Sequence, residues 1–113
     1  MTLTFDNIKN LFSFNTFGKG CAEIEFRVEG MDTYQICWMG KMPDRDCPKK
    51  DCYWYGLVPD GSEAYDYDNF EDFSSAPVFE GKSLKDIYSK IELLSVNSCP
   101  PDPKILNAMG LSL

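Results

Sequence analysis

The sequence of 113 residues contains no histidine. Histidine is the commonest general base, the commonest transition-metal ligand and the usual pH switch near neutrality. Its absence excludes a Cys–His pair and a Ser–His–Asp triad as catalytic machinery. A site built on lysine or on carboxylates stays open, but no motif singles one out. We therefore expect a protein that is not an enzyme and that uses no cofactor.

Long apolar runs are also lacking. No stretch approaches the roughly 18 apolar residues that span a bilayer, and residues 1–6 have neither the basic start nor the apolar run of a secretion signal. We expect a cytoplasmic protein in which the five cysteines are mostly reduced. Their odd number also argues against a closed disulfide framework. The length predicts one domain, 1–113, and a hydrophobic content of 43% is enough for a core.

Basic residues are few, with 11 against 18 acidic residues and a net charge of −7. Proteins bind nucleic acid largely by neutralising its phosphates with lysine and arginine. The charge therefore argues against direct binding to DNA or RNA, and against docking on anionic membranes.

The clearest pattern in the chain is an alternation of apolar and polar residues over 21–28, repeated over 33–39. A period of two is typical of a half-buried strand, and two such runs joined by a short turn predict an antiparallel hairpin. The second run is expected to place Tyr34, Ile36 and Trp38 on one face.

The other elements are predicted from caps, turns and aromatic runs. Thr4 is a plausible N-cap of an opening helix, and Ser83, with Asp86 three residues on, is a plausible start of a later one. Further strands are expected over 52–58, 62–67 and 92–96, a helical turn over 68–73, and a short helix after Asp102. The pattern indicates an α+β fold: an antiparallel sheet of about four to five strands with two or three short helices packed on one face or at the ends.

Gly81-Lys82-Ser83 matches the end of a phosphate-binding loop. The glycine that should open such a loop is Ala76, and Pro77 after it has no N–H to offer a phosphate. The better interpretation is that Gly81 makes a turn and Ser83 caps the helix that follows.

Cys47 and Cys52 have a spacing seen among zinc ligands, and Cys21, Cys37 or Cys99 could complete a four-thiolate shell. A small structural zinc-binding accessory domain is therefore one alternative. The same two cysteines could instead form a disulfide. Cys37 lies within a predicted strand, where a buried thiol is commonly a packing residue.

Charge and aromatic residues are concentrated in one segment. Residues 51–81 contain eight acidic residues and no basic residue, while the remainder has ten acidic and eleven basic ones. The segment also holds eight of the sixteen aromatic residues. Clustered carboxylates steer cationic partners, and exposed aromatic rings add contact area and can stack on arginine. The alternative is that the rings form core and the acids only solvate the surface.

The sequence therefore predicts a non-catalytic protein-binding protein, an inhibitor or an immunity-type protein, whose acidic aromatic surface docks on a basic surface of a partner. A nucleic-acid-handling enzyme is a suitable partner, because carboxylates can occupy a groove that otherwise holds phosphates. A small enzyme or ligand-binding domain that uses carboxylates is the other alternative. The predicted partner-binding residues are Tyr65, Asp66, Tyr67, Asp68, Glu71 and Asp72.

Overall fold

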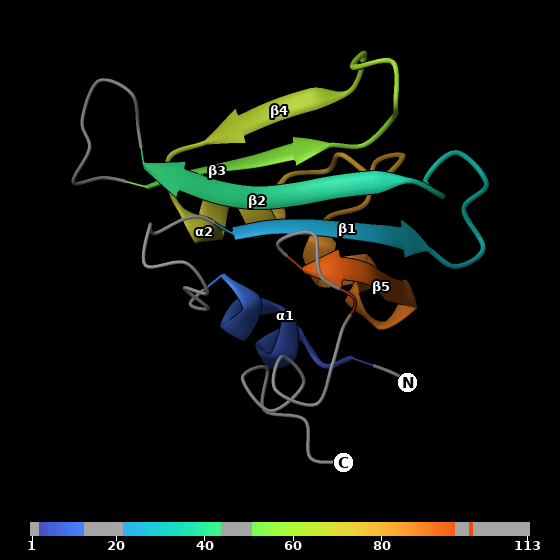
Figure 1. The fold of residues 1–113 in the computed structure, drawn as a ribbon, viewed down its shortest axis with the longest axis horizontal. Helices are drawn as coiled ribbons and strands as arrows, with labels where there is room; N and C mark the ends of the chain where they lie inside the picture. The colour runs from blue at the N-terminus through green and yellow to red at the C-terminus, as the bar shows by residue number, and fades with distance from the viewer. Residues whose placement is uncertain (1–2, 13–21, 44–50, 97–99, 101–113) are drawn as a thin grey trace.

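The structure, a computed structural model, describes residues 3–12, 22–43, 51–96 and 100. These residues form five strands, three short α-helices and one 3-10 helix (Figure 1). In chain order they are α1 (Phe5–Leu11), β1 (Ala22–Val28), β2 (Cys37–Pro43), β3 (Asp51–Gly56), β4 (Ala64–Tyr67), α2 (Phe70–Ser75), α3 (Leu84–Ile87), η1 (Tyr88–Lys90) and β5 (Ile91–Val96). The helix predicted after Asp102 lies outside the described residues.

The strands form one antiparallel sheet in the order β4-β3-β2-β1-β5. Strands β1 to β4 follow one another as a meander, and β5 returns beside β1 after the chain has passed through α2 and α3 (Figure 1). The α+β prediction is confirmed, with an antiparallel sheet and short helices.

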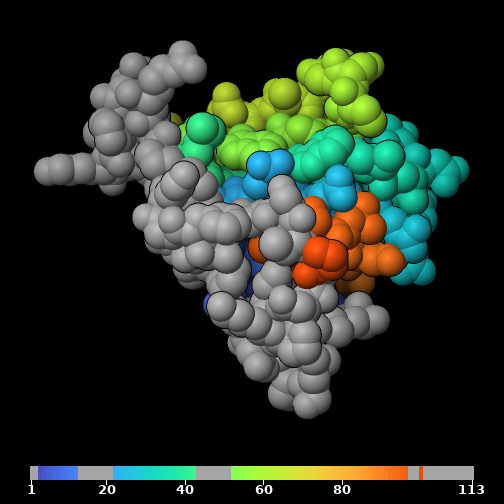
Figure 2. Space-filling view, viewed as in Figure 1, coloured from blue at the N-terminus to red at the C-terminus, as the bar shows by residue number. Residues whose placement is uncertain are grey.

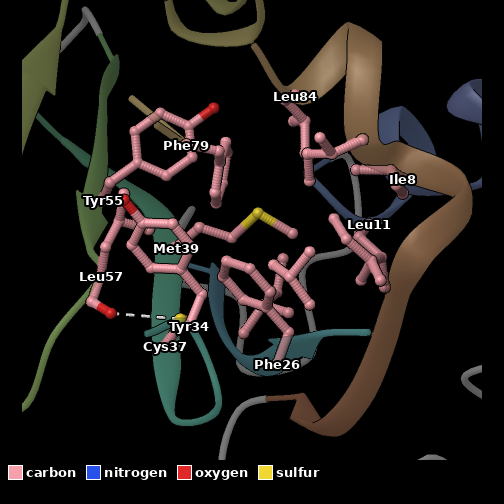
Figure 3. Close-up of a cluster of buried hydrophobic side chains, with 14 of the residues drawn as sticks. Ile8, Leu11, Phe26, Tyr34, Cys37, Met39, Tyr55, Leu57, Phe79 and Leu84 are labelled. Carbon is pink, nitrogen blue, oxygen red and sulfur yellow. Dashed lines mark hydrogen bonds between the residues drawn. The ribbon is translucent and has the colours of Figure 1, made fainter. Parts of the chain in front are cut away.

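The helices cover one face of the sheet. In Figure 1, α2 lies behind β1 to β3, so the face turned to the viewer is the opposite one. Figure 3 shows Ile8 and Leu11 of α1 and Leu84 of α3 directed toward Phe26 and Met39 of the sheet, and all five side chains are at most 1% exposed. This layer between the helices and the sheet is the hydrophobic core.

The face predicted for the second strand is wrong. Strand β2 begins at Cys37, and the fully buried residues are Cys37 and Met39, while Trp38 is half-buried and Ile36 is 50% exposed. All residues from Ile36 to Met39 are apolar, so the alternation does not decide which of them face inward. The register decides it, because Met39 pairs with Ile24, whose side chain is buried on the helix side.

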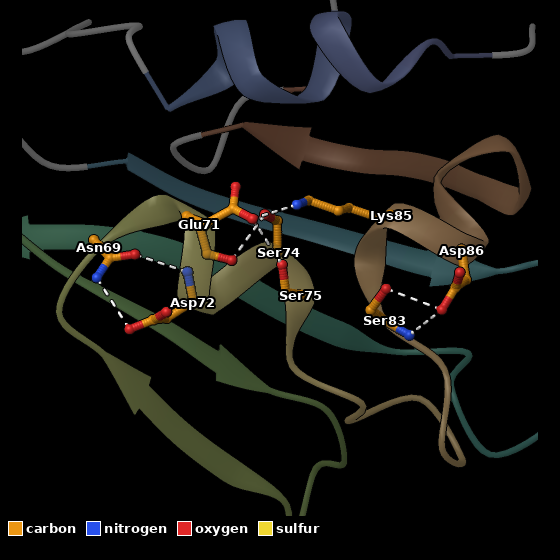
Figure 4. A network of polar contacts seen from close by, with 8 residues as sticks. All are labelled: Asn69, Glu71, Asp72, Ser74, Ser75, Ser83, Lys85 and Asp86. Atoms are coloured by element: carbon orange, nitrogen blue, oxygen red, sulfur yellow. Dashed lines mark hydrogen bonds and ion pairs between the residues drawn. The ribbon is translucent and has the colours of Figure 1, made fainter.

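Both predicted helix caps are present. The Thr4 hydroxyl accepts from the Asn7 N–H (3.1 Å), and the Asn7 side chain accepts from the Thr4 N–H (2.9 Å), which starts α1. At α3, the Asp86 carboxylate accepts from the Ser83 N–H (2.9 Å) and from the Ser83 hydroxyl (3.0 Å) (Figure 4). Gly81 has a φ of +86° in the turn before the cap, as its assignment to a turn predicts.

The hydrogen bonds at the start of α3 make its stability depend on pH. They lower the pKa of the Asp86 carboxyl, because Ser83 donates to the charged form. A lowered pKa stabilises the fold above the ordinary carboxyl value, and this stabilisation is lost as pH falls through the lowered pKa. We expect Asp86→Ala to be less stable than the wild type at neutral pH, and the difference to shrink toward about pH 3.

The difference can be measured by urea denaturation across that pH range. Asp32→Ala is the matched control, because it removes an exposed carboxylate from the turn between β1 and β2. If the gap between Asp86→Ala and the wild type were the same at both ends of the range, the cap would not depend on the charge of Asp86.

Candidate functional site

The predicted partner-binding residues lie on the edge strand β4, in the turn that follows it, and on α2. Strand β4 is the first strand in the sheet order, and among the described strands β3 is its one neighbour (Figure 1). All of its residues are exposed except Tyr67, which is half-buried. The turn and α2 add the exposed residues Asp68, Glu71 and Asp72.

The side chains of β4 divide between the two faces of the sheet. Tyr65 pairs with Tyr55, and Tyr67 pairs with Tyr53, so both tyrosines lie on the helix side. The Tyr67 ring contacts Tyr55 with a centroid separation of 6.1 Å, and burial raises the pKa of its hydroxyl. Tyr65 is 37% exposed. Asp66 faces the other side of the sheet.

Glu71 is matched by a cation within the chain. The Lys85 ammonium lies 2.6 Å from its carboxylate, and the Ser75 hydroxyl donates to the same oxygen (Figure 4). Lys85 and, after it, Ser75 lower the pKa of Glu71. The charge of Glu71 is therefore partly offset before any partner arrives.

Asp72 takes part in the cap of α2. The Asn69 side chain accepts from the Asp72 N–H (2.7 Å) and donates to the Asp72 carboxylate (3.0 Å) (Figure 4). Its carboxylate is exposed in the first turn of the helix, where negative charge is favourable. Asp72 is thus both a surface charge and part of the local fold.

The aromatic rings of residues 51–81 belong mainly to the core. Tyr55, Phe73 and Phe79 are at most 1% exposed, and Tyr65 is the one ring among the segment's eight that is classed as exposed. The Tyr55 and Phe73 rings are stacked with centroids 4.0 Å apart, and the Tyr55 hydroxyl donates to the Phe73 carbonyl (2.8 Å). The alternative interpretation, in which the rings form core, holds for most of them.

Both tryptophans of the chain lie on the face of the sheet opposite the helices, which we call the open face. Sequence reasoning did not identify this surface. Two rows of cross-strand neighbours run over it from β4 to β1. The first row is Asp66, Trp54, Gly40 and Glu23, and the second is Ala64, Gly56, Trp38 and Glu25. Each tryptophan therefore has a glycine as its neighbour on one side and a carboxylate on the other.

The Trp54 indole lies against Gly40. A Cβ added at Gly40 would be 2.8 Å from Trp54 Cζ2 and 2.9 Å from Trp54 Cε2, so the indole occupies the space that a side chain would need. At Gly56 a Cβ would meet only Trp54 Cζ3, at 4.0 Å. There is consequently open space over Gly56, bordered by Trp38, Trp54 and Ala64.

Exposed apolar side chains continue this surface along β2. Met42 lies two residues beyond Gly40 on the same face and is 50% exposed, and Ile36 just before the strand is also 50% exposed. Single exposed apolar residues are ordinary, whereas a group of them marks an interaction surface. The half-buried indoles and Met42 lie on the same, open face of the sheet.

The described cysteines have separate environments. Cys37 is buried, its thiol donates to the Leu57 carbonyl (3.2 Å), and burial raises its pKa to about 12, which is typical of a neutral packing residue. Cys52 is half-buried and pairs with Met42 across β2 and β3. Cys21, Cys47 and Cys99 lie outside the described residues. Among the described residues, no three His, Cys, Asp or Glu side chains are grouped so as to hold a metal.

The fold defines a small α+β protein whose antiparallel sheet has helices on one face and an aromatic, acidic surface on the other. The chain matches no protein-family model, no curated protein and no solved structure. In the part of the chain that the structure describes, no helix is long and apolar enough to cross a membrane.

Proposed function

We propose that this chain is a non-catalytic protein-binding protein, of the inhibitor or immunity type, that docks on a basic surface of a partner. The observation that supports it is the exposure of Asp66 on β4, Asp68 in the turn after it and Asp72 on α2, within a segment, 51–81, that contains no lysine or arginine. A nucleic-acid-handling enzyme offers a basic groove of the right chemistry, because its surface is made to hold phosphates.

Two ion pairs among the described residues involve neither Asp66 nor Asp72. Lys85 is engaged with Glu71, and Arg27 is engaged with Glu92 across β1 and β5, at the other edge of the sheet from β4. Asp66 forms no ion pair with any described residue. Its carboxylate is exposed on the edge strand, where it can steer a cationic surface during encounter.

Reversing the charge of this edge is expected to weaken partner binding at least about tenfold, which corresponds to about 1.4 kcal/mol. The variant is Asp66→Lys with Asp68→Lys, and the measurement is affinity capture from host lysate across a salt series. The wild type should retain a basic protein at low salt and release it steeply as salt rises, whereas the variant should not retain it.

The control changes the net charge equally at another place. Glu29→Lys with Asp32→Lys alters exposed acids in the turn between β1 and β2, at the opposite end of the sheet from the end of β4 (Figure 1). This control should capture the same basic protein as the wild type. Equal capture by the Asp66/Asp68 variant, with the same salt profile, would refute the proposed docking edge.

A further inference from the structure

We propose that the open face of the sheet binds an arginine side chain of the basic partner, with the guanidinium over Gly56, beside the Trp38 and Trp54 indoles and near the carboxylate of Asp66. This inference rests on the proposed function, because it concerns the same partner. It adds a second contact surface and the partner side chain that this surface recognises.

The first argument is the shape of the surface. Gly40 and Gly56 have no side chains, and each is the cross-strand neighbour of a tryptophan. The Trp54 indole occupies the space over Gly40, whereas the space over Gly56 is open apart from the ring edge of Trp54 at 4.0 Å. Ala64 on β4 closes the far side with one methyl group. A narrow, flat group can therefore lie on the backbone at Gly56 between aromatic neighbours.

The second argument is charge complementarity. Asp66 is the cross-strand neighbour of Trp54, and Glu25 is the cross-strand neighbour of Trp38, so a carboxylate stands beyond each indole. Asp66 is the diagonal neighbour of Gly56, and diagonal neighbours in antiparallel strands are about 7–8 Å apart, within reach of a long side chain. Glu25 lies two strands from Gly56, about 10 Å away, so it adds to the negative charge of the surface. The described cation on this face, Arg27, is already engaged with Glu92. The described part of this face thus carries more carboxylates than cations.

The third argument distinguishes arginine from lysine. A guanidinium is planar, stacks on aromatic faces, and can bind a carboxylate through two parallel hydrogen bonds. An ammonium is a compact, strongly hydrated charge that gains less from a flat aromatic surface. Cation–π contact contributes about 0.5–2 kcal/mol depending on desolvation. A surface of indoles, glycines and carboxylates therefore favours arginine.

The space-filling view shows that this face is accessible in the described part of the molecule. Atoms of β1, β2, β3 and β4 lie next to one another at the surface turned to the viewer (Figure 2). The described helices pack on the other face, where their apolar residues meet the inward side chains of the sheet.

The chain provides its own probe for this proposal. Trp38 and Trp54 are its two tryptophans, so intrinsic tryptophan fluorescence reports on the open face alone. We would titrate the full chain with an oligoarginine peptide and with an oligolysine peptide of equal length and charge. Oligoarginine is expected to change the emission saturably and to bind about tenfold more tightly than oligolysine.

Two variants test the geometry. Gly56→Val places a side chain in the open space, where a Cβ has room, so the fold should be retained while the preference for arginine falls to about one. Glu25→Gln with Asp66→Asn should weaken binding of both peptides. Asp32→Asn with Glu29→Gln is the matched control and should leave both titrations unchanged. Circular dichroism and thermal melting establish that each variant is folded.

The outcomes separate the two proposals. If neither peptide bound, the acidic surfaces would attract no cationic partner, and the proposed function would fail together with this inference. If both bound equally and Gly56→Val changed nothing, the acidic docking would stand and the arginine site would be refuted. An emission change that depended on protein concentration without any peptide would instead identify a second copy of the chain as the occupant, which would also refute it.

Discussion

Replacing Phe73 by alanine is expected to lower the free energy of unfolding by about 3–5 kcal/mol. Phe73 is fully buried on α2 and lies at the centre of the aromatic cluster. Its ring stacks on Tyr55 with an interplanar angle of 10° and a centroid separation of 4.0 Å. It also contacts the rings of Phe12, Tyr53, Tyr67 and Phe70. Alanine would leave a cavity surrounded by rings from α2, β3 and β4 and by the ring of the residue that follows α1.

This loss would be a large part of the total free energy of unfolding, because domains are generally stable by only about 5–15 kcal/mol. Chemical denaturation followed by circular dichroism measures it. Tyr55→Phe is the control, because it keeps the stacked ring and removes only the hydrogen bond to the Phe73 carbonyl, for about 1 kcal/mol. If Phe73→Ala cost no more than Tyr55→Phe, the aromatic cluster would not be the centre of stability.

The sequence predicted the elements that carry a local chemical signal. The strict alternation of Ala22 to Val28 with charged residues identified β1, and the side chains of Thr4 and Ser83 marked the starts of α1 and α3. Such signals act between residues close in the chain, so they can be seen without the fold. The helix that begins after Ser83 is short, because the chain tightens into η1 after Ile87.

The open face could not be predicted in this way. It depends on Trp54 pairing with Gly40 and on Trp38 pairing with Gly56, contacts that only the register of β2 and β3 creates. In the sequence, both tryptophans stand in runs of apolar residues that indicate core. The signal that could have revealed them is the glycine two residues after each tryptophan, because glycine inside a strand often marks a place where another group approaches the backbone closely.

The six predicted partner-binding residues were expected to form one surface, but the fold places them on different faces and elements. Side chains alternate along β4, so Tyr67 faces the core and Asp66 faces the open face. Glu71 forms an ion pair with Lys85, which is distant in the sequence. The concentration of charge in 51–81 can be counted in the sequence. The face of the sheet on which each carboxylate lies depends instead on its position along the strand, because successive side chains point to opposite faces. Asp66 consequently belongs both to the predicted edge and to the open face.

Replacing Gly40 by alanine is expected to destabilise the fold by about 1–3 kcal/mol or more. The added Cβ would overlap the carbonyl oxygen of Ala22 on the neighbouring strand, and it would also lie within 2.9 Å of two atoms of the Trp54 indole. The indole can move, but the backbone of β1 can yield only by distorting its pairing with β2. Denaturation measures the loss in stability, and a change in tryptophan emission should accompany it as Trp54 leaves its place.

Gly56→Ala is the matched control, because the same methyl group on the adjacent strand meets nothing closer than 4.0 Å. Alanine reduces the conformational freedom of the unfolded chain, so Gly56→Ala should be as stable as the wild type or up to about 1 kcal/mol more stable. Equal losses for both variants would mean that glycine is needed at each position for its backbone alone. A loss confined to Gly40→Ala would instead establish that position 40 requires glycine because β1 and the Trp54 indole pack closely over it. It would also establish that folding does not need the space above Gly56 to stay empty, so this space can serve for binding.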